Sequence, residues 1–197
     1  MDEHFADDYV KRAQRDGYRS RAVYKLEEID DKERLLRKGG VVLDLGAAPG
    51  AWSQFAVHRL GDEGVVVAVD ILPMDSLAGV IDIHGDINDE AVYQAIKTAL
   101  DGREVDLVLS DMAPNMSGNK TVDQARSIQL AEMAFETAKE LLKPGGDLLI
   151  KVFQGSGSDE LRQSMRATFR KVSTLKPKAS RARSPEVYFL ARNFYLV

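Results

Sequence analysis

The chain alternates short, almost wholly apolar runs with longer segments in which apolar residues recur at three and four positions. The apolar runs are VVLDL, VVVAVD, VIDIH, VDLVLSD and DLLIKVF, at residues 41–45, 65–70, 80–84, 105–111 and 147–153. The helical repeats between them lie at residues 51–60, 89–100 and 123–142. Strands buried on both faces are typical of parallel sheets, whose strands are joined by crossover helices. The pattern therefore predicts a doubly wound α/β sheet.

The C-terminal part adds a different signal to this sheet. A helical pattern at residues 158–169 is followed by two β-like runs, at residues 171–177 and 187–197. We expect these two runs to form an antiparallel pair at one edge of the sheet. A chain of 197 residues can bury one sizeable core. We therefore expect one domain over residues 1–197, in which residues 1–38 form a basic helical extension packed on the rest.

Composition excludes several protein classes. Apolar residues make up 44% and charged residues 29% of the chain, which is ordinary for a globular protein, and no apolar run approaches the roughly 20 residues that cross a bilayer. The charged N-terminus lacks the apolar segment of a secretory signal, so we expect a cytoplasmic protein that does not bind a membrane. We also expect a monomer, since nothing in the sequence indicates an obligate dimer. The absence of cysteine and the unpatterned histidines predict that no metal is bound.

Charge is distributed unevenly. The net charge of −4 argues against a polyanionic partner, yet residues 170–183 contain no acidic residue. The cations of this segment are Arg170, Lys171, Lys176, Lys178, Arg181 and Arg183. A second basic group near the N-terminus includes Arg19, Arg21 and Lys25. Local basic patches fit a protein that docks on phosphates in one place, and they fit two solvated clusters equally well.

In doubly wound sheets ligands bind at the carboxyl ends of the strands, and four aspartates lie there. These are Asp44, Asp70, Asp86 and Asp111. A single aspartate at a strand end is more often a turn former than a ligand-binding group, but four in succession weaken that interpretation. Asp70 lies where a carboxylate takes ribose hydroxyls. The edge is therefore a candidate nucleoside site.

The first strand leads into the turn DLGAAPGAW, residues 44–52, in which Gly46 and Gly50 let the backbone approach a ligand at a helix N-terminus. A dinucleotide fingerprint needs a second glycine where this turn has alanine, and Pro49 lacks a backbone N–H. A nucleoside ligand without pyrophosphate, such as S-adenosylmethionine, fits better. We expect Trp52 to line this pocket; the alternative is ordinary core packing.

Lys151 is the most unusual residue, because it stands between Ile150 and Val152 inside an apolar run. An isolated charge in an apolar interior costs several kcal/mol unless it is paired or loses its proton. Lys151 therefore needs partners, a route to water, or a chemical role.

Several segments together resemble the FtsJ/RrmJ family of ribosomal RNA methyltransferases. They are LDLGAAPGAWSQ, VAVDILPM, GDI, SDMAPNMSG, LLIKVFQG and SRARSPEVYFLARNF, and the resemblance extends from residue 18 to the C-terminus. It implies a Rossmann-like class I methyltransferase fold, with a mostly parallel seven-stranded sheet, an antiparallel edge strand and helices on both faces. It also implies S-adenosylmethionine as methyl donor and 2′-O-methylation of a uridine in large-subunit ribosomal RNA. The assembled large subunit would be the substrate, and the methylation would aid ribosome maturation.

The resemblance also implies roles for individual residues. The family's catalytic set matches Lys25, Asp111, Lys151 and Glu186. Cofactor contacts are expected from Gly46, Gly50, Trp52, Asp70, Asp86 and Asp111. RNA phosphates would be held by Arg19, Arg21, Lys176, Lys178, Arg181 and Arg183.

Methyl transfer to a ribose hydroxyl needs a group that accepts the hydroxyl proton, and a neutral Lys151 amine can do so. Desolvation and the charge of Lys25 favour the neutral amine, whereas Asp111 and Glu186 favour the ammonium form. A charged Lys151 would instead orient the ribose and stabilise oxyanion character. We favour the proton acceptor.

Three alternatives compete with this interpretation. Base N-methyltransferases carry an Asn/Asp-Pro-Pro-aromatic turn after the fourth strand, and here the turn is Asp-Met-Ala-Pro. A non-catalytic RNA-binding assembly factor would keep the basic patches without needing Lys151. A methyltransferase could also act on another RNA, such as transfer RNA. The segment 115–124 after Asp111 is expected to be a loop that helps to close the site or a plain connector.

Overall fold

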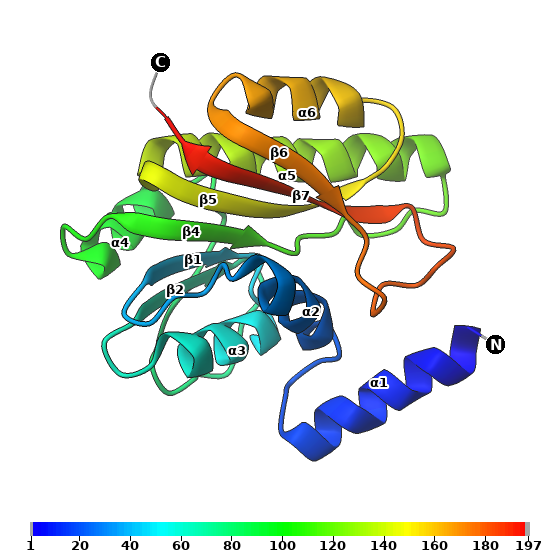
Figure 1. Ribbon diagram of the computed structural model, residues 1–197, viewed down its shortest axis with the longest axis horizontal. Helices are drawn as coiled ribbons and strands as arrows, with labels where there is room; N and C mark the ends of the chain where they lie inside the picture. The colour runs from blue at the N-terminus through cyan, green and yellow to red at the C-terminus, as the bar shows by residue number, and fades with distance from the viewer. Residues whose placement is uncertain (1, 196–197) are drawn as a thin grey trace.

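Seven strands form one mixed sheet in the computed structural model, which describes residues 2–195, with side chains from residue 8 onward (Figure 1). The strands are β1 (Val41–Leu45), β2 (Val65–Asp70), β3 (Val80–His84), β4 (Val105–Ser110), β5 (Leu142–Phe153), β6 (Phe169–Leu175) and β7 (Glu186–Phe194). Their order is β3-β2-β1-β4-β5-β7-β6. Strands β1 to β5 pair in parallel, and the predicted doubly wound fold is confirmed.

The predicted antiparallel pair at one edge of the sheet is confirmed, since β6 and β7 pair antiparallel there. β7 lies inside the sheet, antiparallel to both β5 and β6, so that β6 is the edge strand. Residues 196 and 197 of the predicted second run lie outside the described residues. The insertion places the start of β7 directly beside the end of β5.

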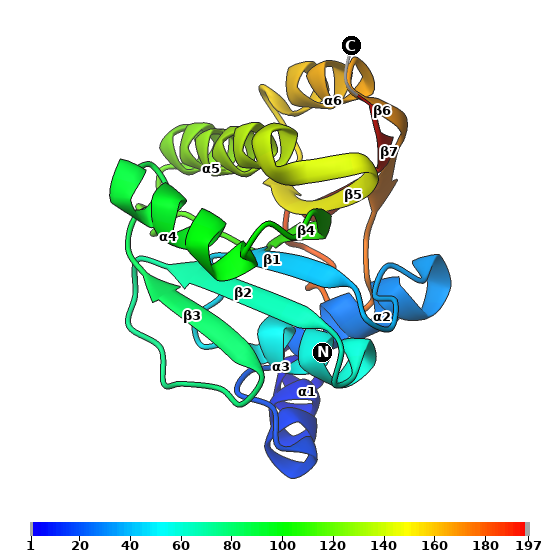
Figure 2. The same ribbon diagram turned by 90° about the vertical axis from the view of Figure 1, so that its left-hand side faces the viewer.

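Helices cover both faces of this sheet (Figure 2). They are α1 (Asp2–Asp16), α2 (Val23–Glu33), α3 (Ala51–Leu60), α4 (Glu90–Leu100), α5 (Lys120–Leu141) and α6 (Ser158–Arg166). Buried residues of α4, α5 and α6 pack in one core cluster, and those of α2 and α3 pack in the other. The two-sided core explains why the central strands lack a polar face.

Strand β1 illustrates how the core is built. All five of its residues are buried, and their side chains alternate between the two clusters, with Leu43 and Leu45 on one side and Val42 on the other. Full burial of such side chains contributes about 1.5–3 kcal/mol each. The strand is thereby fixed in register, and the turn that follows it is held in place.

The N-terminal helix α1 extends away from the sheet (Figure 1) and is attached through its last turns. Ala13 is buried against the α2 side of the core, and the Arg12 guanidinium lies 4.0 Å from the ring centre of Tyr24. The Tyr24 hydroxyl donates to Asp16 at 2.9 Å. These contacts connect residues 8–16 to helix α2.

Two predicted boundaries are wrong. Helix α5 begins at Lys120, because the Asn119 side chain accepts hydrogen bonds from Thr121 N and Val122 N at 3.1 and 3.3 Å, so only the first half of segment 115–124 is a loop. Strand β5 begins at Leu142 rather than 147, because a register shift against β4 accommodates the glycine-containing segment.

Candidate active site

The Lys151 side chain lies at the end of β5 with only 7% of its surface exposed. Its Nζ donates to the backbone oxygen of Asp111 at 2.6 Å and lies 3.2 Å from Asp111 Oδ1. Asp111 follows β4, which pairs with β5 in parallel, so neighbouring strand ends bring the two residues together. The buried amine is thus partnered by one aspartate through two oxygens.

Lys25 and Glu186 form the second half of the cluster. Lys25 comes from α2, and its Nζ lies 2.8 Å from Glu186 Oε1 at the start of β7. The same carboxylate oxygen accepts a hydrogen bond from Ser180 Oγ at 2.8 Å. Burial opposes ionisation of Glu186, but the Lys25 charge and hydrogen bond, together with Lys151 and Ser180, bring its pKa below the ordinary value. Glu186 is therefore a carboxylate at neutral pH.

Tyr188 joins the two halves, and the sequence interpretation missed it. Its hydroxyl donates to Asp111 Oδ1 at 2.6 Å and lies 3.4 Å from Glu186 Oε1. Burial raises its pKa well above the ordinary value, and the charges of Asp111 and Glu186 add to this, so the phenol stays protonated. The alternation of β7 was the available signal, since Tyr188 shares a face with Glu186 and pairs with Lys151.

All four residues predicted for the catalytic set are thus connected by short contacts. A cavity of about 280 Å³ opens beside them and is lined by Lys25, Glu186, Ser184 and two arginines, Arg21 and Arg181. The negative charge of a polyanion would meet cations at this entrance. The geometry therefore places a basic opening, lined by Lys25 and Glu186, beside the network that holds the buried Lys151 amine.

The glycine turn forms the neighbouring part of the edge. Gly50 has φ 108°, and a Cβ there would lie 2.7 Å from Leu77 Cδ1 and 2.8 Å from Met74 Sδ. A side chain at Gly46 would collide with Met112. Both glycines are thus required by close approach of the surrounding loops, which pack directly on the turn at the start of α3.

The Asp70 carboxylate organises this turn. Its two oxygens accept hydrogen bonds from Ala48 N at 2.8 Å and from Leu72 N at 2.7 Å. Ile71 and Leu72, directly after β2, are 64% and 60% exposed. Exposed apolar side chains next to a carboxylate at a strand end provide a surface for a flat ring and an acceptor for hydroxyls.

The remaining residues predicted to contact the cofactor lie in different surroundings. Asp86 is exposed, and its Oδ1 accepts from Asn88 N at 2.9 Å. Trp52 is buried, its Nε1 donates to Ala22 O at 2.8 Å, and its ring lies 5.8 Å from that of Tyr188. The Trp52 side chain therefore belongs to the core, and its backbone lies in the first turn of α3.

Asp44 is fully buried beneath the turn. Ser53 Oγ donates to its Oδ2 at 2.7 Å. Burial raises the pKa of Asp44 to about 7, with the charges of Asp111 and Asp70 acting in the same direction and the Ser53 hydrogen bond opposing them. The Asp44 carboxyl group thus connects β1 to α3, and its pKa lies near neutral pH.

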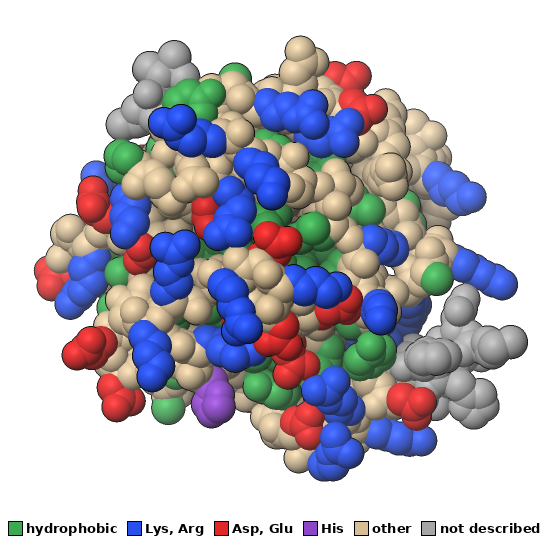
Figure 3. Space-filling view, viewed as in Figure 1, with side chains coloured by type: hydrophobic (Ala, Val, Ile, Leu, Met, Phe, Trp, Pro, Cys, Tyr) green, Lys and Arg blue, Asp and Glu red, His purple; other side chains and the backbone are tan. Residues whose placement is uncertain are grey.

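The six cations predicted to bind RNA divide into two groups. Arg19 donates to the backbone oxygens of Pro49, Asp75 and Ser76 at 2.6–3.1 Å, so it links the N-terminal segment to loops around the glycine turn. Arg21 donates to Ala179 O, and Lys176 to the backbone oxygens of Ser184 and Glu186. Lys176 is exposed as well, like the remaining three cations, Lys178, Arg181 and Arg183. Lys and Arg side chains gather over this face of the molecule (Figure 3).

Two features are absent from the described part of the chain. None of the helices there combines the length and apolarity of a bilayer-crossing segment. Among the same residues, no three or more side chains of His, Asp or Glu are grouped as ligands for a metal ion.

Comparisons with known proteins agree with this geometry. The profile of the family described as FtsJ-like methyltransferase matches residues 18–194. The chain is 59% identical to ribosomal RNA large subunit methyltransferase E of Hydrogenovibrio crunogenus, over 98% of this chain and 93% of the relative. It is 57% identical to the protein of the same name from Alkalilimnicola ehrlichii, over 100% and 94%. A crystal structure of a ribosomal RNA methyltransferase from Plasmodium falciparum superposes with TM-score 0.82 and 32% identity, over 90% of this chain and 98% of the other.

Proposed function

The chain belongs to the FtsJ-like methyltransferase family, and from this premise we propose that it methylates the ribose 2′-hydroxyl of a uridine in large-subunit ribosomal RNA. The observation that carries the proposal is the buried Lys151 amine held by Asp111 beside the Lys25–Glu186 pair. Relatives named for methylation of the ribosomal large subunit align over nearly the whole chain, which supports the substrate class.

The residues at the strand ends fit S-adenosylmethionine. Asp70 offers carboxylate oxygens for ribose hydroxyls, and Ile71 and Leu72 offer exposed apolar surface for the adenine ring. Gly46 and Gly50 allow the surrounding loops, with Met112, Met74 and Leu77, to pack closely around the turn next to Asp70. We propose that these residues, with Trp52 through its backbone, Asp86 and Asp111, hold the donor. Once bound, it supplies an electrophilic methyl group.

We assign the proton-acceptor role to Lys151. A neutral amine has two N–H bonds and one lone pair, and the two Asp111 oxygens at 2.6 and 3.2 Å match the two N–H bonds. The lone pair is then directed to the ribose hydroxyl, whose proton it takes as the oxygen attacks the methyl carbon. Asp111 thereby orients the base, and the buried position of the amine limits competing hydration.

Lys25, Glu186 and Tyr188 complete the site as a connected network. Glu186 fixes Lys25 at 2.8 Å, and Tyr188 connects both carboxylates through its hydroxyl. The Lys25 ammonium then places positive charge near the ribose oxygen, where it stabilises negative charge as the proton leaves. Removing any member would leave a buried polar group without its partner.

We propose that Lys178, Arg181 and Arg183 contact RNA phosphates, since they are exposed beside the cavity that holds Lys25 and Glu186. For Arg19, Arg21 and Lys176 we propose an indirect contribution, because each donates to backbone oxygens of the surrounding loops. We further propose that the chain acts in the cytoplasm as one monomeric methyltransferase domain on the assembled large subunit, with residues 1–38 as its extension.

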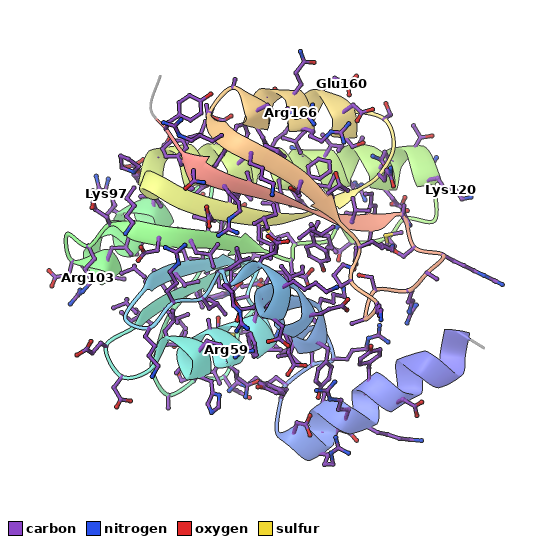
Figure 4. The ribbon with its side chains drawn as sticks, in the orientation of Figure 1. Arg59, Lys97, Arg103, Lys120, Glu160 and Arg166 are labelled. Carbon is purple, nitrogen blue, oxygen red and sulfur yellow. The ribbon has the colours of Figure 1, made fainter. Side chains whose placement is uncertain are left out.

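The test incubates the purified protein and labelled donor with naked ribosomal RNA, free large subunits and transfer RNA, and then maps the methylated ribose. We expect label in large-subunit RNA, with the assembled subunit as the better substrate. Lys151→Met keeps the apolar stem and should lower kcat by about 10²–10⁴-fold while donor binding persists. Lys97→Ala, on the other side of the molecule, is the matched control (Figure 4).

The outcomes separate the competing functions. Label in transfer RNA alone would refute the substrate assignment and leave the reaction type intact. An assembly factor without catalysis would give no label, and Lys151→Met would keep its full effect on subunit assembly in cells.

A further inference from the structure

A second cavity, of about 720 Å³, lies next to the one that contains Lys25 and Glu186. Its walls come from three segments, residues 116–125, 153–156 and 183–185, and Ser184 lines both cavities. Its volume is within the range of about 300–1,000 Å³ that small-ligand sites occupy. Nothing in the proposed reaction at Lys151 uses this space.

The floor of the second cavity continues the strands that carry the reactive residues. Phe153 follows Lys151 by two positions on β5 and pairs with Glu186 on β7. Just beyond this pair, Gln154 N donates to Pro185 O at 2.8 Å. A polymer that places one unit at Lys151 therefore meets this cavity with an adjacent unit.

The walls combine apolar, amide and cationic groups. Met116 is 67% exposed and faces the cavity together with Pro185. Gln154 is exposed and carries both a hydrogen-bond donor and an acceptor. Lys120 and Arg183 add positive charge to the lining, and Lys120 lies at the start of α5, pointing away from the sheet (Figure 4).

The acidic residue of the lining, Asp123, is held by hydrogen bonds from the loop after β4. Its side chain is buried, and its oxygens accept from Ser117 N, Ser117 Oγ and Gly118 N at 2.8, 2.7 and 3.2 Å. The hydrogen bonds from Ser117 lower the pKa of Asp123. These hydrogen bonds hold the loop after β4 and partly compensate the Asp123 charge, and the other charged residues of the lining, Lys120 and Arg183, are cationic.

The cavity is formed before any ligand arrives. Gln124 Nε2 donates to Phe153 O at 2.8 Å and to Ser156 O at 3.0 Å, and Ser127 Oγ accepts from Phe153 N at 3.0 Å. On the opposite wall, Lys176 holds Ser184 O at 2.7 Å. A preformed site avoids most of the ordering cost of binding.

We propose that this cavity binds the base of the nucleotide next to the methylated one. Met116 and Pro185 contact the face of the base, the Gln154 amide contacts its hydrogen-bonding edge, and Lys120 and Arg183 neutralise the adjoining phosphate. The proposal rests on the proposed function, because a neighbouring nucleotide exists only if Lys151 receives a ribose. The neighbouring nucleotide would then contribute to the choice of the ribose that is methylated.

The test uses synthetic RNA fragments that span the mapped methylation site and carry an abasic residue immediately 5′ or 3′ of the target. With the wild-type protein, one of the two abasic fragments should lose about tenfold in kcat/KM. Met116→Ser and Gln154→Ala should lose a similar factor on intact RNA, lose no further activity on that abasic fragment, and leave the KM for the donor unchanged. Ile81→Ser changes an exposed position on β3 away from this cavity. This control variant should lose as much kcat/KM on the abasic fragment as the wild-type protein does.

Two results would overturn the proposal. Effects of the variants and of the abasic residue that multiply independently would show that they do not contact each other. Equal activity of the wild-type protein on intact and abasic fragments would show that the neighbouring base is not bound. Failure of the wild-type protein to methylate any ribose is a different result, since it removes the proposed function and this proposal with it.

Discussion

The hydroxyl of Tyr188 donates to Oδ1 of Asp111 at 2.6 Å, the same carboxylate oxygen that the Lys151 amine contacts. One oxygen thus contacts both a phenol and the amine that we propose as proton acceptor. Since the phenol stays protonated, it withdraws charge from Asp111 without titrating itself. Tyr188 therefore positions Asp111 and, through it, Lys151.

Tyr188→Phe should lower kcat by about tenfold, because the buried oxygen of Asp111 loses one hydrogen bond of roughly 1–2 kcal/mol. The KM values for donor and RNA should change little, since the Tyr188 side chain is fully buried and lines neither cavity. Rapid-quench measurement of single turnovers would isolate this step. Tyr195→Phe, near the end of the described chain, is the control; equal losses in both variants would contradict a positioning role for Tyr188.

Lys151→Arg should be nearly as inactive as Lys151→Met, because a guanidinium keeps its proton and cannot accept another. Single-turnover rates of the two variants with saturating donor are the measurement. An active Lys151→Arg variant would instead favour a charged lysine that orients the ribose.

Arg19→Ala should raise the KM for S-adenosylmethionine several-fold, because the guanidinium holds Pro49 O, Asp75 O and Ser76 O around the proposed donor pocket. We expect RNA affinity to keep the wild-type salt dependence. Equilibrium dialysis with the donor and filter binding with RNA separate the two effects. A changed salt slope with normal donor binding would instead support the direct contact between Arg19 and RNA that was predicted from charge alone.

Arg181→Ala should weaken RNA binding and reduce the slope of log K against log salt by about 0.7–0.9, the value for one lost phosphate contact. Arg166→Ala removes a cation from α6 on the far side of β6 and should leave the slope unchanged (Figure 4). The measurement is a salt titration of RNA affinity at fixed pH. Identical slopes in the wild-type protein and both variants would show that Arg181 does not contact an RNA phosphate.

Asp44 makes stability depend on pH in an unusual direction. Its pKa rises from 3.8 to about 7 on folding, so between these values the folded chain binds more protons than the unfolded chain. The contribution of Asp44 to the free energy of unfolding is therefore full below pH 4 and falls as pH rises to 7. Asp44→Asn should remove this fall and be more stable than wild type at pH 8, by on the order of 2 kcal/mol.

Chemical denaturation at pH 4.5 and pH 8 would measure the Asp44 effect, with the exposed Asp82→Asn as control. A difference between wild type and Asp44→Asn that is the same at both pH values would show that Asp44 has an ordinary pKa in the folded chain. Donor-free protein is required, because Asp44 lies beneath the glycine turn.

Sequence periodicity was sufficient for β1, β2 and β4, because their apolar runs are buried on both sides, whereas β3 was found although its residues are half-buried or exposed. It could not place β7 inside the sheet, since a strand's neighbours depend on long-range pairing rather than on local pattern. The same limit hid Tyr188, whose partner Asp111 is far away in the sequence. Lys151 was found because a buried charge is costly wherever it occurs.

Charge patterns were less informative than apolar patterns. Arg19 and Lys176 carry the same charge as the exposed Arg181, yet they donate to backbone oxygens that the sequence cannot locate. Trp52 was expected to line the ligand pocket, but its indole packs in the core and donates to Ala22 O. A side chain's direction depends on which loop lies opposite, and that information appears only in the folded chain.

The interior position of β7 has a consequence for biosynthesis. Lys25 leaves the translating ribosome early, but its partner Glu186 and the connecting Tyr188 stand on a strand that must insert between β5 and β6. A nascent chain can form strands β1 to β4 first. The cluster around Lys25 is complete only after β7 has left the ribosome. If Lys25 and Glu186 act as proposed, methyl transfer is expected only from chains in which β7 has been synthesised and paired.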